Sequence, residues 1–252
     1  MQLHCKILGE GRPVVLLHGL FGASDNWLGI APKLATQFRL YLPDLRNHGQ
    51  SPHHAEMTYP HLAADVERFM TAQGLACAPV IGHSMGGKVA MQLALQYPQR
   101  VTKLVVSDMA PRAYQPVHDK IFAALLALDL PAFTSRMEIE EALAPEIPNL
   151  VLRRFLLKNL GRDATGKFFW KMNLRGVAEN YGKLGETLVA SAPYPGPTLF
   201  VRGGRSRYIA SADETRIREL FPAAVIQTIP QAGHWIHADA PDEFIRMVQE
   251  FL

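Results

Sequence analysis

Short runs of consecutive apolar residues alternate with amphipathic stretches along most of the chain. Apolar runs bounded by glycine or polar residues are typical of buried parallel strands, whereas apolar residues every three or four positions indicate helices. The expected strands are residues 2–8, 14–17, 40–42, 78–81, 103–106, 197–201 and 224–229. One expected helix begins near residue 24, and the others cover about 60–72, 85–97, 211–221 and the chain from 241 onward. This order predicts an α/β fold, with a mostly parallel central sheet flanked by helices.

The alternation of strands and helices stops between residues 111 and 190. Two groups of apolar residues at helical spacing lie in this segment. They are Ile121, Leu125, Leu126 and Leu128, and Leu150, Leu152, Phe155 and Leu156. We therefore expect a core made of residues 1–110 and 191–252, with residues 111–190 inserted into it as a helical cap.

Composition and charge exclude several classes of protein. The 252 residues, 48% of them hydrophobic and 19% charged, suit one large globular domain. A net charge of +3 without a basic run argues against a nucleic-acid partner. No apolar stretch reaches the roughly 18 residues of a membrane helix, and no signal peptide is recognisable. We expect a cytoplasmic monomer or homodimer in which Cys5 and Cys77 are buried free thiols.

The most informative stretch is Gly82-x-Ser84-x-Gly86, between an expected strand and an expected helix. Ser84 must turn there with a strained backbone, and the two glycines allow neighbouring main chain to approach closely. Such a turn exposes the serine Oγ and directs the N–H of Met85 toward a developing oxyanion. The alternative is a glycine-rich turn that contains an ordinary serine.

Two further loops follow expected strands at the same edge of the sheet. The loop of residues 18–22 is rich in glycine, and its Leu20 N–H is a candidate second oxyanion donor. We interpret the side chain of His18 as structural. Asp44 and Arg46, after the next strand, are expected to form a local ion pair that fixes their loop.

Four stretches resemble the α/β-hydrolase superfamily in their order and spacing, over essentially the whole chain. They are His18-Gly19-Leu20, Asp44-x-Arg46-x-x-Gly49-x-Ser51, Gly82-His83-Ser84-Met85-Gly86-Gly87 and Gly233-His234. More narrowly, residues 15–27 and 200–206 are similar to the YbfF-type esterases, which are related to the ABHD11-type hydrolases. The resemblance implies a serine nucleophile, an acid and a histidine in that chain order, and hydrolysis of esters or acyl-CoA thioesters.

The acid departs from the common pattern of the superfamily. A serine, Ser206, stands where the acid usually follows the strand after the cap, and Asp213 lies further on in an expected helix. Asp108 ends the preceding strand, at the same edge of the sheet, and the YbfF-type esterases are similar in placing the acid there. We expect Asp108 to orient the histidine, with Ser206 as a nearby hydrogen-bond partner. The alternative is that Asp108 caps the N-terminus of a helix or lies at the hinge of the inserted cap segment.

His234 is the candidate base because it follows a glycine in the loop after the last expected strand. It would take the proton of Ser84 and pass it to the leaving group, while Asp108 fixes its tautomer. The alternative is a structural loop histidine. We interpret the nearby His237 as a surface residue at the start of a helix. This chemistry requires neither a metal nor an organic cofactor.

The expected cap carries candidate substrate-binding residues. Eight basic and two acidic residues lie within 150–185, and a surface of one sign concentrates anions, although most such runs are only solvated. The candidates for an anionic group are Arg153, Arg154 and Lys158, and those for an apolar acyl group are Phe168, Phe169 and Trp170. A small-molecule ester or acyl-CoA is therefore the expected substrate. A carbon–carbon bond hydrolase or lyase, or a relative that binds a ligand without turnover, remains the alternative.

Overall fold

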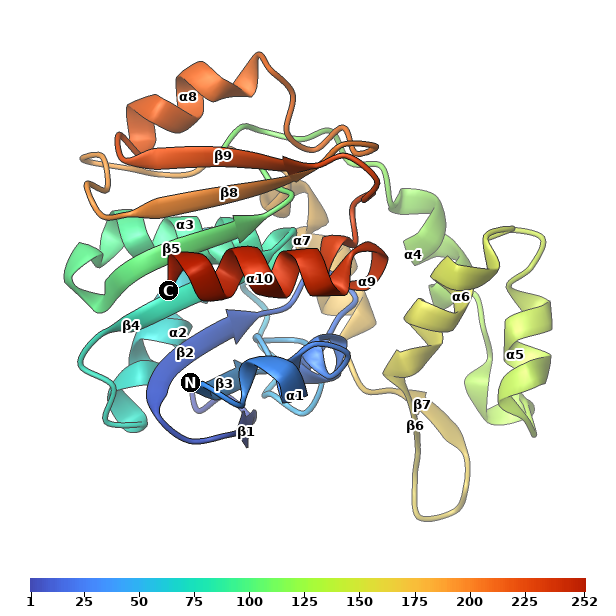
Figure 1. The fold of residues 1–252 in the computed structure, drawn as a ribbon. Helices are drawn as coiled ribbons and strands as arrows, with labels where there is room; N and C mark the ends of the chain where they lie inside the picture. Colours follow the sequence, from blue (N-terminus) through green and yellow to red (C-terminus); the bar gives the residue numbers. More distant parts are fainter.

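A seven-stranded sheet forms the centre of the computed structural model, which describes residues 1–252 (Figure 1). The strand order is β1-β3-β2-β4-β5-β8-β9, and only β1 is antiparallel to its neighbour. The strands are β1 (Cys5–Leu8), β2 (Arg12–Leu17), β3 (Phe38–Pro43), β4 (Ala78–His83), β5 (Val101–Ser107), β8 (Thr198–Gly203) and β9 (Ala224–Ile229). Every expected strand is present, and the expected α/β class is confirmed.

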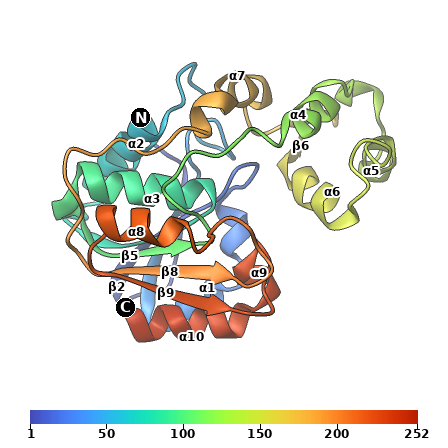
Figure 2. The same ribbon diagram turned by 90° about the horizontal axis from the view of Figure 1, so that it is seen from above.

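Helices cover both faces of this sheet (Figure 2). On one face lie α2 (Tyr59–Ala72), α3 (Met85–Gln96) and α8 (Asp213–Leu220), and on the other α1 (Ala31–Leu34), α9 (Ile236–Asp239) and α10 (Pro241–Phe251). The residues of β2 explain why two hydrophobic cores result. Val15 and Leu17 belong to one core and Val14 and Leu16 to the other, because successive side chains of a strand point to opposite faces.

The segment between β5 and β8 projects beside the sheet (Figures 1 and 2). It contains α4 (Asp119–Leu126), α5 (Arg136–Ala142), α6 (Leu150–Leu156) and α7 (Leu174–Leu184), with short 3-10 turns at Leu130–Ala132 and Leu157–Asn159. It is not entirely helical, because β6 (Leu160–Arg162) and β7 (Phe168–Trp170) form an antiparallel hairpin. Helix α7 returns the chain to the core, where the Tyr59 hydroxyl donates to the carbonyl of Leu184 at 2.8 Å.

Three expectations about individual side chains are wrong. Cys77 is exposed and Cys5 is half-buried, although both thiols are free. Arg46 does not pair with Asp44, because its Nε lies 2.5 Å from Oδ2 of the buried Asp65 on α2. The Arg46 Nη1 also donates to the carbonyl of Glu56 at 2.5 Å. Partners 10 and 19 residues further along the chain therefore hold this guanidinium.

No helix is both long and apolar enough to cross a bilayer.

Candidate active site

Ser84 lies in the sharp turn between β4 and α3. Its backbone has φ 55° and ψ −121°, a left-handed φ that is rare for residues other than glycine. A Cβ at Gly82 would collide with the carbonyl of Gly86, and a Cβ at Gly86 would collide with the carbonyl of Leu17 on β2. The turn therefore needs both glycines, as the sequence indicates.

His234 lies between Ser84 and Asp108. Its Nε2 is 3.0 Å from the Ser84 Oγ, and its Nδ1 is 2.8 Å from the Asp108 Oδ2. The carboxylate can only accept at Nδ1, so the Nδ1–H donates to Asp108 and the hydroxyl of Ser84 donates to Nε2. The three side chains come from residues that follow β4, β5 and β9, whose carboxyl ends meet at one edge of the sheet.

The carboxylate of Asp108 is completely buried and fully hydrogen-bonded. Besides His234, it accepts from the N–H of Gly203 at 3.1 Å and from the hydroxyl of Ser206. Asp213 is engaged elsewhere: its Oδ1 pairs with the Nε of Arg112 at 2.9 Å. Of the two carboxylates considered from the sequence, the structure brings Asp108 to the histidine.

Aromatic side chains hold His234 in place. The ring of Tyr208 stacks on the imidazole, with 3.9 Å between centroids, and the Nε2–H of His83 donates to the His234 carbonyl at 2.9 Å. His237 is buried rather than on the surface, because its ring packs between Trp27 and His83. Burial lowers the pKa of His237 to about 4 and that of His83 well below its usual value, so both rings are neutral at pH 7.

Two backbone amides are free to bind an anion beside Ser84. Met85 is the first residue of α3, where an N–H has no partner within the helix, and the N–H of Leu20 donates to no other group of the protein. The Leu20 loop is fixed from below, since His18 Nε2 accepts from the N–H of Leu45 at 3.0 Å. His18 is fully buried, in agreement with the structural interpretation of its side chain.

Comparison with known proteins decides the family. The profile of the α/β hydrolase fold matches residues 12–133. The sn-1-specific diacylglycerol lipase ABHD11 of Mus musculus is 39% identical over 247 residues, which are 95% of this chain and 80% of that protein. The chain belongs to the α/β-hydrolase family. The resemblance inferred from the sequence motifs is therefore confirmed.

Two further relatives resemble this α/β hydrolase over nearly their whole length. Esterase YbfF of Escherichia coli (strain K12) is 35% identical over 246 residues, which cover 96% of this chain and 94% of that protein. A solved structure described as a marine microorganism esterase has a TM-score of 0.97 and 42% sequence identity, and the match covers 100% of this chain and 99% of that one.

Two cavities of the hydrolase meet at Ser84. The first has a volume of 380 Å³ and is lined by Ser84, Leu20 and Met85 among 17 residues, more than half of them hydrophobic. The second measures 220 Å³ and is lined by Ser84 and Leu20 as well, together with His234. A third cavity of 410 Å³ adjoins the second, because Asn26, Phe155 and Trp235 line both.

The aromatic residues proposed from the sequence for acyl binding do not reach these cavities. Phe168, Phe169 and Trp170 form β7, and none of them lines the three cavities. The guanidinium of Arg162 lies 4.0 Å above the ring of Phe168, and the ring of Phe169 covers Gly161. Phe168 and Phe169 therefore pack within the hairpin, and the contact of the three rings with substrate stays a prediction.

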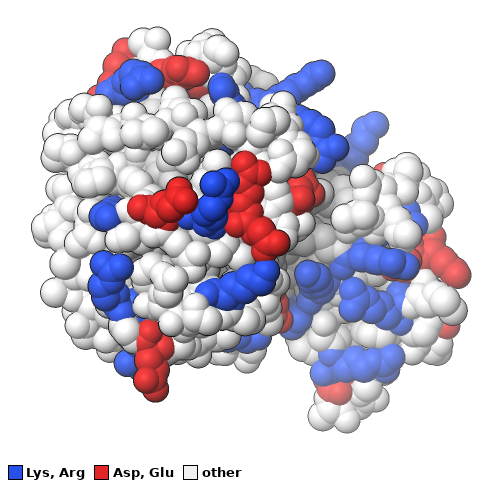
Figure 3. All heavy atoms as spheres, in the orientation of Figure 1, with Lys and Arg blue, Asp and Glu red and all other residues white.

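The basic residues proposed from the sequence are divided between two environments. Lys and Arg gather on the lobe that contains α6 and the β6–β7 hairpin (Figure 3). Arg154 and Lys158 line the third cavity. Arg153 lines none of the three, because its Nη1 donates to the carbonyls of Ile147 and Pro148 at 2.7 and 3.0 Å.

Two further residues of the site, Tyr208 and Lys88, were not predicted from the sequence. Tyr208 stacks on His234 and lines the first two cavities. Its position two residues after Ser206 is the feature of the sequence that could have identified it. Lys88 lines the first cavity although its side chain is completely buried. A lysine four positions after Ser84 lies on the same side of the helix as the serine, and this spacing could have identified it.

Proposed function

We propose that the chain hydrolyses carboxylic esters through an acyl-enzyme on Ser84. The observation that carries the proposal is the continuous set of contacts from Ser84 Oγ to His234 Nε2 at 3.0 Å, and from His234 Nδ1 to Asp108 Oδ2 at 2.8 Å. Relatives named esterase and lipase, which match at 35–39% identity, support an ester as the substrate.

The proposed reaction has two halves. In the first, the Ser84 Oγ attacks the ester carbonyl while His234 Nε2 takes the hydroxyl proton, and His234 then returns this proton to the departing alkoxide. In the second, His234 removes a proton from water, and the resulting hydroxide attacks the acyl-enzyme. The acid leaves, and the proton on His234 returns to Ser84, so the enzyme is unchanged at the end.

The surrounding groups stabilise the charges of this reaction. The N–H groups of Leu20 and Met85 would bind the oxyanion of both tetrahedral intermediates. Asp108 would hold the Nδ1–H tautomer of His234 and stabilise the imidazolium, while Ser206 positions the Asp108 carboxylate by its hydrogen bond. We further propose that residues 111–190 act as a cap that encloses the substrate.

Acyl-CoA thioesters are a second candidate substrate class, favoured by one observation. Arg154 and Lys158 line the cavity that continues from the His234 side of the site, where they could bind the phosphates of a leaving group. Arg153 provides a matched control, since its guanidinium is occupied by carbonyls of its own segment.

A fluorophosphonate probe and a panel of p-nitrophenyl esters and acyl-CoAs test these proposals. We expect the probe to label wild-type protein at Ser84, and Ser84→Ala to lose both labelling and about 10⁴–10⁶-fold in kcat. More than a tenth of the wild-type activity in Ser84→Ala would disprove the proposed nucleophile. If acyl-CoA is a substrate, Arg154→Ala and Lys158→Ala lower its kcat/KM while Arg153→Ala does not.

A further inference from the structure

The first cavity contains three cationic side chains and no carboxylate. Lys88, Arg112 and Arg207 line it, and no Asp or Glu does. Lys88 is completely buried, whereas Arg207 is exposed, so the positive charges extend from the interior of the cavity to its mouth. A cavity of 380 Å³ is within the usual range of roughly 300–1,000 Å³ for small-molecule sites.

No carboxylate forms an ion pair with Lys88, although the charge of Glu186 acts on it at longer range. Its Nζ donates to the backbone carbonyl of Glu186 at 2.5 Å and lies about equally far, 5.0 and 5.1 Å, from the ring centroids of Tyr59 and Tyr114. An ammonium group has three donors, and a buried charge without a counter-ion is costly. Burial lowers the pKa of Lys88 to about 8, which leaves the group mainly protonated at pH 7.

The two arginines differ in how far their charge is already balanced. Arg112 pairs with Asp213 at 2.9 Å, and its guanidinium lies 4.0 Å from the ring centroid of Tyr114. Arg207 makes no hydrogen bond or ion pair through its side chain. Lys88 and Arg207 are therefore the two cations of the cavity that remain available to an anionic ligand.

The position of His234 decides which part of an ester would enter this cavity. The leaving oxygen must receive its proton from His234, and this histidine lines the second cavity but not the first. The N–H of Met85, which would bind the carbonyl oxygen, belongs to a residue that lines only the first. The leaving group therefore extends into the second cavity, and the acyl chain into the first.

We infer that the enzyme prefers acyl groups that carry a carboxylate at their far end, the half-esters of dicarboxylic acids. Lys88 and Arg207 would bind this carboxylate, while the hydrophobic majority of the lining contacts the methylene chain between it and the ester. This inference rests on the proposed ester hydrolysis at Ser84.

Two chromogenic esters of equal chain length test the inference: mono-p-nitrophenyl adipate, and p-nitrophenyl hexanoate, which ends in a methyl group. After subtraction of spontaneous hydrolysis, we expect kcat/KM to be about tenfold higher for the adipate, the ratio that about 1.4 kcal/mol represents. Lys88→Met and Arg207→Gln should each lower this ratio. Arg205→Gln should not, because Arg205 is exposed on the same loop but does not line the cavity.

The outcomes separate the inference from the function on which it rests. Hydrolysis of the hexanoate and labelling of Ser84, with no preference for the adipate, would overturn the inference and leave the ester hydrolase intact. A preference that Arg207→Gln leaves unchanged would also overturn the proposed site, and this variant decides the matter if Lys88→Met does not fold. Failure to hydrolyse either ester, without labelling of Ser84, would refute the proposed function itself.

Discussion

Ser84 and Asp108 share an unusual backbone conformation at neighbouring strand ends. Their φ angles are 55° and 50°, in the left-handed region that residues other than glycine rarely adopt. Each N–H is held by the next strand, since Ser84 donates to the Ser107 carbonyl at 3.1 Å and Asp108 to the Val201 carbonyl at 2.9 Å. Such strain costs about 1–3 kcal/mol for each residue and persists only where the surroundings fix it. Here it points both side chains at one imidazole.

The charge of Asp108 is expected to be essential for turnover. Asp108→Asn keeps the shape of the side chain but removes the charge opposite the imidazolium, so kcat should fall by roughly 10³–10⁴-fold with little change in KM. Ser206→Ala removes one hydrogen bond to the same carboxylate and should cost only about tenfold. Steady-state kinetics with one ester measures both. An equal or larger loss in Asp213→Asn would contradict the assignment of Asp108.

The turn between β4 and α3 is the element on which the site depends. In Gly86→Ala the new methyl would overlap the Leu17 carbonyl, so β2 and α3 must separate. We expect the free energy of unfolding to fall by at least about 1–3 kcal/mol and esterase activity to be nearly lost. Urea unfolding and kinetics measure the two effects. Gly29→Ala is the control, because nothing lies within 4 Å of a Cβ there, and its stability should hardly change.

The sequence predicted those elements whose cause is local. The strands are continuous apolar runs, and the Ser84 turn is marked by glycines at fixed offsets, so both could be recognised from a few residues. The hairpin of β6 and β7 was missed because Phe168 finds its partner, Arg162, only after the chain has turned. For the same reason the ion pair of Arg46 with Asp65 could not be foreseen. The catalytic roles assigned to the site residues stay predictions.

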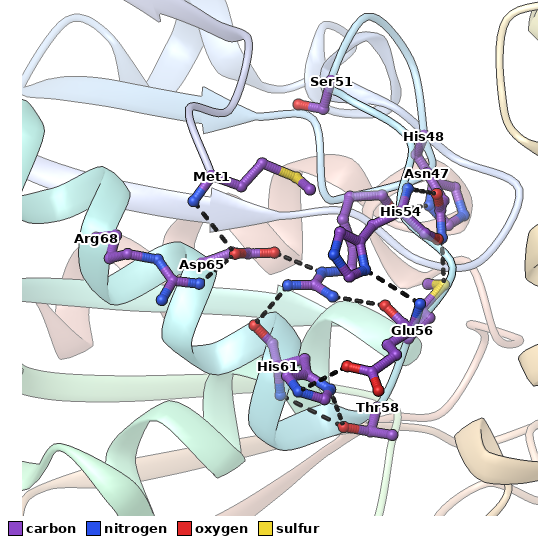
Figure 4. Close-up of polar contacts among 12 residues, drawn as sticks. Met1, Asn47, His48, Ser51, His54, Glu56, Thr58, His61, Asp65 and Arg68 are labelled. Atoms are coloured by element: carbon purple, nitrogen blue, oxygen red, sulfur yellow. Dashed lines mark hydrogen bonds and ion pairs between the residues drawn. The ribbon is translucent and has the colours of Figure 1, made fainter.

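At the scale of the whole molecule, Asp65 connects parts of the chain that are far apart (Figure 4). Its carboxylate on α2 pairs with Arg46 at 2.5 Å, Arg68 at 2.7 Å and the amino group of Met1 at 3.7 Å. Burial alone would raise the pKa of Asp65, but the hydrogen bonds of the two arginines outweigh it and hold the pKa below its usual value. The loop after β3 and the start of the chain are thereby fixed to one helix.

This network predicts a large loss of stability when the Asp65 carboxylate is removed. Asp65→Ala leaves the Arg46 guanidinium buried without its carboxylate, and the free energy of unfolding should fall by about 3–5 kcal/mol. Urea denaturation at pH 7.5 measures this loss. Glu67→Ala, at a half-buried carboxylate on the same helix, should cost much less. Equal losses of unfolding free energy in the two variants would show that the buried ion pair stabilises the protein no more than the half-buried carboxylate of Glu67 does.

Four buried histidines make stability depend on pH. Burial lowers the pKa of His18, His48, His83 and His237, to about 3 for His48 and about 4 for His237. In the unfolded chain the pKa of each histidine returns to about 6.5, and the ring binds a proton below that pH. A fall in pH therefore stabilises the unfolded state relative to the folded one. The contribution of these neutral rings to stability is therefore fully present above about pH 7 and is lost progressively toward pH 4.

Between pH 7.5 and 5.5 His48 and His237 should each remove about 1.4 kcal/mol from the free energy of unfolding, and His18 and His83 add to this loss. Urea denaturation at the two pH values measures the sum. His48→Gln should reduce the difference between them by about the share of one histidine, whereas His53→Gln, at an exposed position, should leave it unchanged. A free energy of unfolding that is equal at both pH values would contradict the neutral, buried state of these rings.

Ser84 and Leu20 line two cavities at once, and this arrangement bears on how products leave. In the proposed reaction the alcohol departs on the His234 side while the acyl chain still occupies the other cavity. The vacated side is then open to any small hydroxyl compound, and water has to compete with it for the acyl-enzyme. The proportion of free acid to newly formed ester would then depend on the concentrations and reactivities of the two acceptors, so the proposed ester hydrolase would also exchange one alcohol for another.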